Sequence, residues 1–178
     1  MQNRMVITNV LLILTLAACA SDPNRRTPGV LIDDMALEPI IKNEIFKSNS
    51  DFKGSHIVVV SLNGIVLLAG QVASEALLNQ AGEVAGQMRR VRKVHNELTV
   101  GGPTSLVART NDSWLTTKVK ARLIASESTE GLKVKVLTEN GVVYLMGSVS
   151  RAQADAAIAV ASNVYGVQKI VKVFEYVE

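Results

Sequence analysis

The chain of 178 residues shows the same succession of sequence signals twice, at a spacing of 77 or 78 positions. The repeat is clearest at two Asn-Gly pairs, Asn63-Gly64 and Asn140-Gly141, each of which lies between two apolar runs. An Asn-Gly pair in this setting predicts a two-residue β-hairpin turn, because both positions require positive φ angles. A period of this length is too long for a solenoid unit and indicates a duplicated small domain.

Apolar runs flank the two turns in the same way. The run after each turn covers residues 65–72 and 142–149 and contains one glycine in each copy. The run before each turn alternates in character, and the aligned pairs are Ile57 with Val59 and Val134 with Val136. Because alternate residues of a strand share one face, we expect these four side chains to point toward a core.

Helical patterns surround each predicted hairpin. Apolar residues recur at every fourth position ahead of it, which predicts a short amphipathic helix. These residues are Leu37, Ile41 and Ile45 in the first copy and Leu115, Val119 and Leu123 in the second. A second helix is predicted over residues 76–88 and 152–164, with Ser74 and Ser150 as N-caps and Gln153 completing a capping box.

A last apolar strand closes each copy. Its candidate residues are Val94, Leu98 and Val100 in the first copy and Ile170, Val173 and Phe174 in the second. The sequence therefore predicts an α+β protein of two tandem small domains, each with the order α-β-β-α-β and with its helices packed on a three-stranded sheet.

The two domains are assigned to residues 34–100 and 112–178. Residues 101–111 form the predicted linker, because their opening Gly-Gly-Pro supports neither helix nor strand. Residues 19–33 contain two prolines and few large apolar side chains, which is typical of a flexible tether.

The first strand of the first copy is apolar on both faces, since Val58 and Val60 accompany the core-facing pair. The second copy carries Lys133 and Lys135 on the corresponding outer face. An apolar outer face requires cover, so we expect the two domains to pack on each other.

Residues 1–18 have the features of a secretory signal. Arg4 precedes an uncharged apolar run over residues 6–18, and 13 residues are too few to span a bilayer as a helix. Cleavage before Cys19 lowers the formal charge from +3 to +2. A nearly balanced, exported chain is not expected to bind nucleic acid.

The single cysteine closes the tetrapeptide Leu16-Ala17-Ala18-Cys19, which resembles the lipobox of bacterial lipoproteins. That resemblance implies an S-diacylglycerol and an N-acyl chain such as palmitate on Cys19, which together would hold the protein on a membrane. Ala20, in place of an aspartate, implies sorting to the outer membrane. The alternative is a periplasmic protein without a lipid, cut after Ala18 or Ala20, in which the unpaired thiol is incidental.

The two copies resemble BON domains, named for bacterial osmotically induced and nodulation proteins. The resemblance rests on Gly70 and Gly147 within the second-strand patterns, on the segment 112–118 and on the lipobox, and it covers nearly the whole chain. It implies an outer-membrane lipoprotein that faces the periplasm and binds anionic phospholipid, such as phosphatidylglycerol, through its second domain. It also implies a role in envelope integrity, division-associated remodelling and the stress response.

The candidate lipid site is the first helix of the second domain. On a helical wheel Trp114, Thr117, Lys118 and Ala121 point to one side of its core-facing stripe. Tryptophan suits the headgroup boundary, and Lys118 and Arg122 can each contribute about 1 kcal/mol at lipid phosphates. Alternatively, Trp114 packs against the linker or the other domain, and the basic residues are simply solvated.

A second basic patch follows the predicted second helix of the first domain. It comprises Arg89, Arg90, Arg92 and Lys93. Cations at the end of a helix complement its dipole, so the patch is expected to be structural. Its alternative roles are a contact with lipid or with a carboxylate-bearing envelope protein.

The sequence gives no basis for catalysis or for a metal site. His56 and His95 both stand beside apolar strand residues, without a matching set of cysteines or acids. We therefore expect a non-enzymatic protein whose only cofactor is the covalent lipid. The alternative function is a structural or adaptor module that binds another envelope protein or peptidoglycan.

Overall fold

The computed structural model describes the backbone of residues 28–177 and the side chains of residues 34–177. The predictions about the signal peptide, Cys19 and its lipid, and the tether up to residue 27 lie outside these residues. No helix within the described part is long and apolar enough to cross a membrane.

Both copies have the predicted order of elements. The first consists of α2 (Pro28–Ser48), the 3-10 turn η2 (Ser50–Phe52), β1 (His56–Leu62), β2 (Ile65–Val72), α3 (Glu75–Gln87) and β3 (Lys93–Val100). The second consists of α4 (Leu106–Ala125), η3 (Gly131–Lys133), β4 (Lys135–Glu139), β5 (Val142–Val149), α5 (Arg151–Ser162) and β6 (Lys169–Tyr176). The α+β class with two three-stranded sheets is confirmed.

Each sheet combines a hairpin with a parallel crossover. β1 pairs antiparallel with β2, and β2 pairs parallel with β3 after the chain crosses over through α3; β4, β5 and β6 repeat this order. The φ angles are 53° at Asn63, 73° at Gly64, 50° at Asn140 and 74° at Gly141. Both Asn-Gly turns therefore have the left-handed conformation that the sequence predicts.

The helix caps follow the sequence closely. Ser74 accepts a hydrogen bond from the N–H of Leu77, and Ser150 with Gln153 forms a complete capping box. Two helices nevertheless begin earlier than predicted. Residues 28–33, assigned to the tether, belong to α2, and residues 106–111, assigned to the linker, belong to α4.

These corrections have local physical causes. Pro28 stands at the first position of α2, where a missing backbone N–H costs nothing. Ser105 caps α4 because its Oγ accepts the N–H of Ala108 at 3.2 Å. The linker is therefore shorter than predicted and ends at Ser105, the residue that caps α4.

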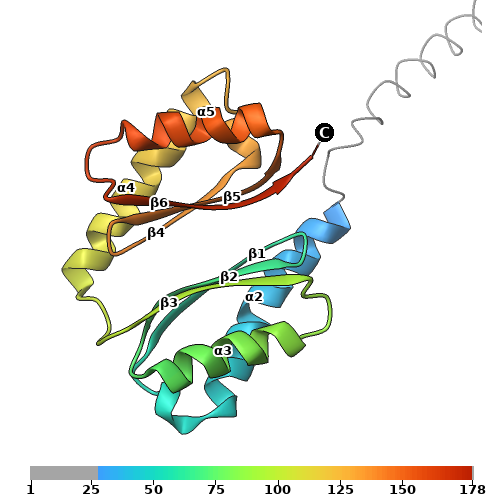
Figure 1. The fold of residues 1–178 in the computed structure, drawn as a ribbon, viewed down its shortest axis with the longest axis vertical. Helices are drawn as coiled ribbons and strands as arrows, with labels where there is room; N and C mark the ends of the chain where they lie inside the picture. The colour runs from blue at the N-terminus through green and yellow to red at the C-terminus, as the bar shows by residue number, and fades with distance from the viewer. Residues whose placement is uncertain (1–27, 178) are drawn as a thin grey trace, which may run out of the picture.

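Helices α2, α3, α4 and α5 lie on the outer faces of the two sheets, and the inner faces of the sheets meet (Figure 1). From one side to the other the layers are α2 with α3, the first sheet, the second sheet, and α4 with α5. Each domain has its own hydrophobic cluster between its helices and its sheet, which buries Ile41 and Ile45 in the first domain and Val119 and Leu123 in the second.

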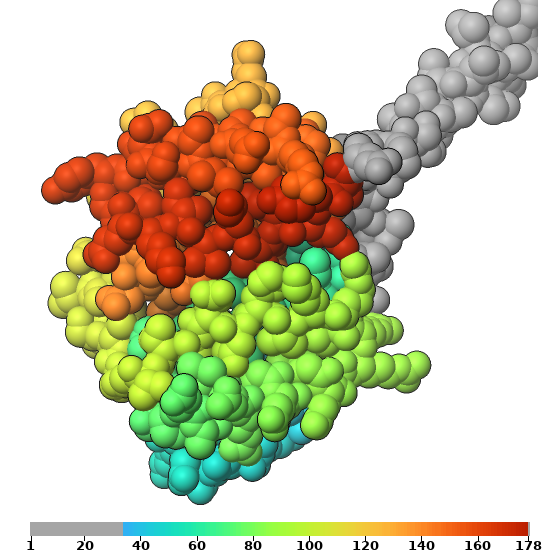
Figure 2. All heavy atoms as spheres, in the orientation of Figure 1, coloured from blue at the N-terminus to red at the C-terminus, as the bar shows by residue number. Residues whose placement is uncertain are grey.

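A third hydrophobic cluster joins the domains. Its buried members are Leu62, Ile65, Leu67, Ala69, Tyr144, Met146 and Val173. The domains are consequently in contact along their length, as the space-filling view shows (Figure 2). The two domains pack on each other as expected, and most of the buried residues between them belong to β2 and β5.

Polar contacts frame this interface. His56 Nε2 lies 3.0 Å from Glu139 Oε1, and Lys135 Nζ donates to the carbonyl oxygen of Ser61 at 2.7 Å and to Glu38 at 3.1 Å. Lys135 therefore lies on the face of its sheet that points away from the core of its own domain, as predicted, and it is bonded there to the first domain. Lys133 lies in η3, just before the strand, and pairs with Glu130 instead.

Candidate functional site

The tryptophan of the second domain is an exposed residue of α4. Trp114 is 65% exposed and is absent from the cluster that joins the domains. Lys118 follows one helical turn later, and its Nζ lies 4.0 Å from the centroid of the Trp114 ring. This cation–π contact contributes about 0.5–1 kcal/mol at an exposed position and fixes the two side chains on one face.

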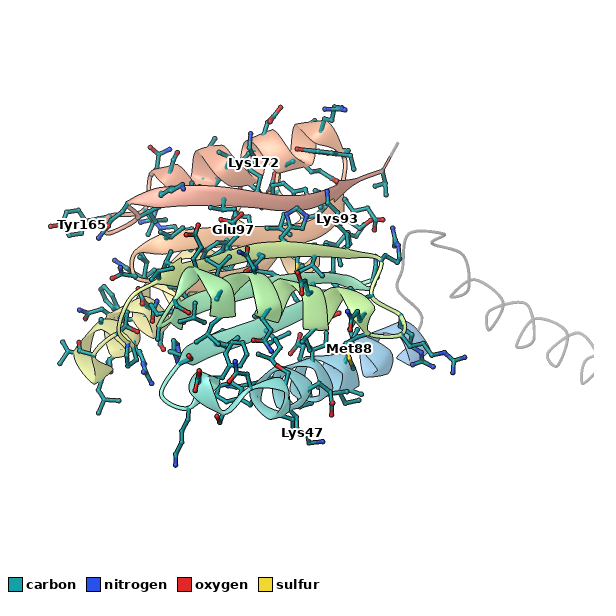
Figure 3. The ribbon with its side chains drawn as sticks, turned by 60° about the horizontal axis from the view of Figure 1, so that its bottom comes forward. Lys47, Met88, Lys93, Glu97, Tyr165 and Lys172 are labelled. Atoms are coloured by element: carbon teal, nitrogen blue, oxygen red, sulfur yellow. The ribbon has the colours of Figure 1, made fainter. Side chains whose placement is uncertain are left out.

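Lys118 has a second partner outside its own helix. Its Nζ donates to the carbonyl oxygen of Tyr165 at 3.0 Å. Tyr165 belongs to the turn between α5 and β6 and is 93% exposed. Its ring points away from the fold (Figure 3). Trp114 and Tyr165 therefore line one hollow, and the contact of Lys118 with the Tyr165 backbone joins the α5–β6 turn to α4.

Sequence reasoning missed Tyr165, although a signal was present. The turns after α3 and α5 both contain a residue with positive φ, Arg90 at 79° and Gly166 at 104°. When the two copies are aligned at Arg90 and Gly166, Tyr165 corresponds to Arg89. The two copies differ in chemistry at this turn, as they do at Trp114, which aligns with Ala36.

The other predicted residues of α4 divide into two groups. Ala121 and Arg122 are exposed and line one hollow together with Lys118 and Tyr165. Thr117 is exposed but lines neither hollow beside Lys118, and its hydroxyl donates to the carbonyl oxygen of Ser113 at 3.0 Å. Its hydrogen bond is thus satisfied within the helix.

The accessible charge on α4 is positive only. Its basic residues are Arg109, Lys118, Lys120 and Arg122, and its single acidic residue is Asp112. Asp112 is 7% exposed, and its carboxylate accepts the backbone N–H groups of Asn140 and Gly141 at 2.8 and 2.9 Å. The helix therefore presents cations, with no exposed carboxylate of its own, to whatever lies against it.

The basic patch of the first domain is arranged differently. α3 ends at Gln87 with Met88 as its C-cap, so the four cations follow the helix, as in the sequence-based prediction, and none lies in its last turn. Arg92 donates to the carbonyl oxygen of Asn63 and forms an ion pair with Glu175 of the second domain. Arg89, Arg90 and Lys93 are exposed. Figure 3 shows Lys93 and Tyr165 on separate parts of the molecule.

The two histidines both have structural surroundings. His56 contacts Glu139 across the domain interface. Burial lowers the pKa of His95, and the neighbouring charge of Lys93 adds to this effect. Among the residues that the structure describes, no group of three or more His, Cys, Asp or Glu side chains could hold a metal ion.

Comparison with known proteins places these features in a family context. The family model described as BON domain matches residues 33–102 and 111–178. "Outer membrane lipoprotein DolP" of Haemophilus influenzae is 40% identical over 162 residues, which cover 91% of this chain and 83% of the relative. This similarity confirms the outer-membrane location expected from the sequence.

Two further relatives match over most of their length. "21 kDa hemolysin" of Actinobacillus pleuropneumoniae is 39% identical, with 86% of this chain and 79% of the relative covered. "Osmotically-inducible protein Y" of Escherichia coli is 32% identical, with 84% and 75% covered.

Proposed function

This chain belongs to the BON-domain family, and from that premise we propose that it is a non-enzymatic lipoprotein that binds anionic phospholipid through α4 of its second domain. The observation that carries the proposal is the contact of the exposed Trp114 ring with the half-buried Lys118, on a helix whose accessible charge is positive only. An amphipathic ring beside a cation matches the boundary between acyl chains and lipid phosphates.

Other exposed apolar side chains of the second domain support the same conclusion. Leu106 and Val107, in the first turn of α4, are 78% and 72% exposed, and Tyr165 adds a second exposed ring. Exposed apolar side chains that gather around cations are expected at a membrane-contact surface. Each cation near an anionic surface contributes about 1 kcal/mol, so Lys118 and Arg122 together favour anionic over neutral lipid.

The tryptophan is not needed for folding. The first domain builds the same helix with Ala36 at the aligned position, and the core contacts of both helices come from the stripe that includes Leu37 and Leu115. A large apolar side chain kept at an exposed position of one copy is best explained by contact with something outside the fold.

The anchor completes the proposal. We place an S-diacylglycerol and an N-acyl chain on Cys19, so that the protein stays on the periplasmic face of the outer membrane. Because the anchor keeps α4 at a high local lipid concentration, a weak intrinsic affinity is sufficient. Through this contact the protein supports envelope integrity and division-associated remodelling under stress.

Vesicle binding tests the lipid contact directly. Residues 20–178, without the lipid, are mixed with vesicles of phosphatidylcholine alone or with phosphatidylglycerol, and bound protein is recovered by flotation. We expect binding that requires phosphatidylglycerol and that is lost in the double variant Trp114→Ala, Lys118→Glu. Lys172→Glu, which makes the same charge change at an exposed position of β6, is the control and is expected to bind normally.

Thermal melting shows whether each variant is folded. Equal binding by wild type and a folded double variant would move the contact elsewhere, first to Arg89, Arg90, Arg92 and Lys93. If the wild-type protein binds neither kind of vesicle, the adaptor function toward an envelope protein or peptidoglycan replaces the proposal.

A further inference from the structure

We infer that the surface around Lys118 is a discrete site for one phospholipid molecule, with separate places for the headgroup, the phosphate and an acyl chain. This inference rests on the proposed lipid contact and goes beyond it, because adhesion to a bilayer needs no individual lipid site. Two hollows lie on either side of Lys118, and Lys118 and Tyr165 line both of them.

The first hollow, of about 370 Å³, lies between α4, the β4–β5 turn and the α5–β6 turn. Its lining includes three amide side-chain residues, Asn111, Asn140 and Gln168. Asp112 also borders it, but the carboxylate oxygens of Asp112 already accept backbone N–H groups. Neutral amides both donate and accept, so this hollow suits an uncharged headgroup that carries hydroxyls rather than a cationic ammonium headgroup.

The second hollow, of about 600 Å³, lies between α4 and the end of α5. Ala121, Ala125 and Val164 form its mostly apolar floor. The positions of α2 aligned with the two alanines hold Asn43 and Lys47, so small apolar residues are not required there by the fold. We assign this hollow to the proximal part of an acyl chain.

The phosphate belongs at the ridge between the hollows. The ammonium group of Lys118 has three N–H donors, of which the Tyr165 carbonyl oxygen takes one. Arg122, one turn later at the edge of the second hollow, has no hydrogen bond or ion pair with any residue that the structure describes. A phosphate between these two cations carries its headgroup toward the first hollow and its acyl chains toward the second.

The dimensions and the chemistry agree with this assignment. Small-molecule sites are hollows of about 300–1,000 Å³ with apolar walls and a few polar groups that fix orientation. Here the polar headgroup would lie in the first hollow and the apolar acyl chain in the second, with the phosphate between them at Lys118 and Arg122. A surface used only for adhesion would need the rings and the charges but not this separation.

A monomeric lipid distinguishes the two possibilities. The probe is dihexanoyl phosphatidylglycerol, kept below its critical micelle concentration, and the protein is residues 20–178, which include every element of both sheets. Titration calorimetry and Trp114 fluorescence are the readouts. We expect saturable binding of one lipid per chain.

The sharpest variant is Ala121→Phe, which fills the second hollow while it adds apolar surface to the membrane-contact face. We expect it to weaken binding of the monomeric lipid by at least about tenfold, although the substitution adds apolar surface. Ala152→Phe is the control, because this exposed position at the other end of α5 lies 11 residues, or about 16 Å, from Asn163 along the helix.

The outcomes separate this inference from the function on which it rests. If vesicles bind but the monomeric lipid does not, or if Ala121→Phe binds the monomer as wild type does, the surface is adhesive only and the single-lipid site is wrong. If neither the monomer nor anionic vesicles bind to the folded wild-type protein, the proposed function itself fails.

Discussion

The carboxylate of Asp112 accepts the backbone N–H of Gly141 at 2.9 Å, and so ties the first helix of the second domain to its hairpin turn. The first domain repeats this contact, since Asp34 accepts the N–H of Gly64 at 3.2 Å. Both aspartates are buried, and both also bind the N–H of the asparagine that precedes the glycine. This repeated contact sets the position of α4, and therefore of Trp114, relative to the sheet.

We predict that Asp112→Ala destabilises the protein by about 1–3 kcal/mol, because it leaves buried N–H donors at Asn140 and Gly141 without a partner. Asp112→Asn should cost less, since its side-chain oxygen can still accept one of the two hydrogen bonds. Urea unfolding measures both changes. An unchanged midpoint for Asp112→Ala would show that the contact contributes little.

The anchor prediction concerns Cys19. Cys19→Ser should accumulate as the full-length precursor and should no longer float with the outer membrane, because the serine hydroxyl does not receive the diacylglycerol. Immunoblots of fractionated cells report both the size and the location. Normal processing together with normal fractionation would refute the assignment of the lipid.

Salt dependence should separate the roles of the two central side chains. Lys118→Glu is expected to weaken binding to phosphatidylglycerol vesicles more at 20 mM than at 500 mM salt, because ions screen its repulsion from the anionic surface. Trp114→Ala removes apolar insertion, so its loss of binding should be similar at both salt concentrations. Flotation at the two concentrations makes the comparison, and identical salt profiles for the two variants would contradict the division of roles.

Separation of the domains should expose the cluster that joins them. Leu62, Leu67 and Ala69 are at most 1% exposed in the whole protein, and Tyr144 and Met146 cover their side of the interface. We therefore expect residues 28–102 alone to unfold at a lower temperature or to aggregate. Calorimetry and light scattering provide the test. An isolated first domain that is monomeric and as stable as it is in the whole chain would show that the interface adds no stability.

The features that could be predicted from the sequence are those encoded locally. The Asn-Gly turns and the capping box of Ser150 and Gln153 each depend on residues within four positions, and the structure contains all of them. The partners across the domain interface were harder to identify. β2 is buried along its entire length, and a continuous apolar run does not reveal which residues face which layer.

The candidate site was predictable only in part, for a related reason. Trp114 and Lys118 are one helical turn apart, so their shared face follows from periodicity. Tyr165 meets Lys118 from 47 positions away, and only the packing of the α5–β6 turn against α4 brings them together. The hollows depend on the same packing, and no local pattern encodes them.

The last prediction uses the two glycines that occupy aligned positions in β2 and β5. Gly70 has a φ of 120°, and a Cβ at this position would lie 2.0 Å from the carbonyl oxygen of His56. At Gly147 φ is not in the left-handed range, and the nearest atom to an added Cβ is the carbonyl oxygen of Lys133 at 3.1 Å. We expect Gly70→Ala to cost at least about 2 kcal/mol, because backbone strain and a backbone clash act together, and Gly147→Ala to cost clearly less. Urea unfolding of both variants measures the difference. If the two substitutions cost the same, the aligned glycines serve the same role in both domains, and the strained conformation at Gly70 is not what requires a glycine.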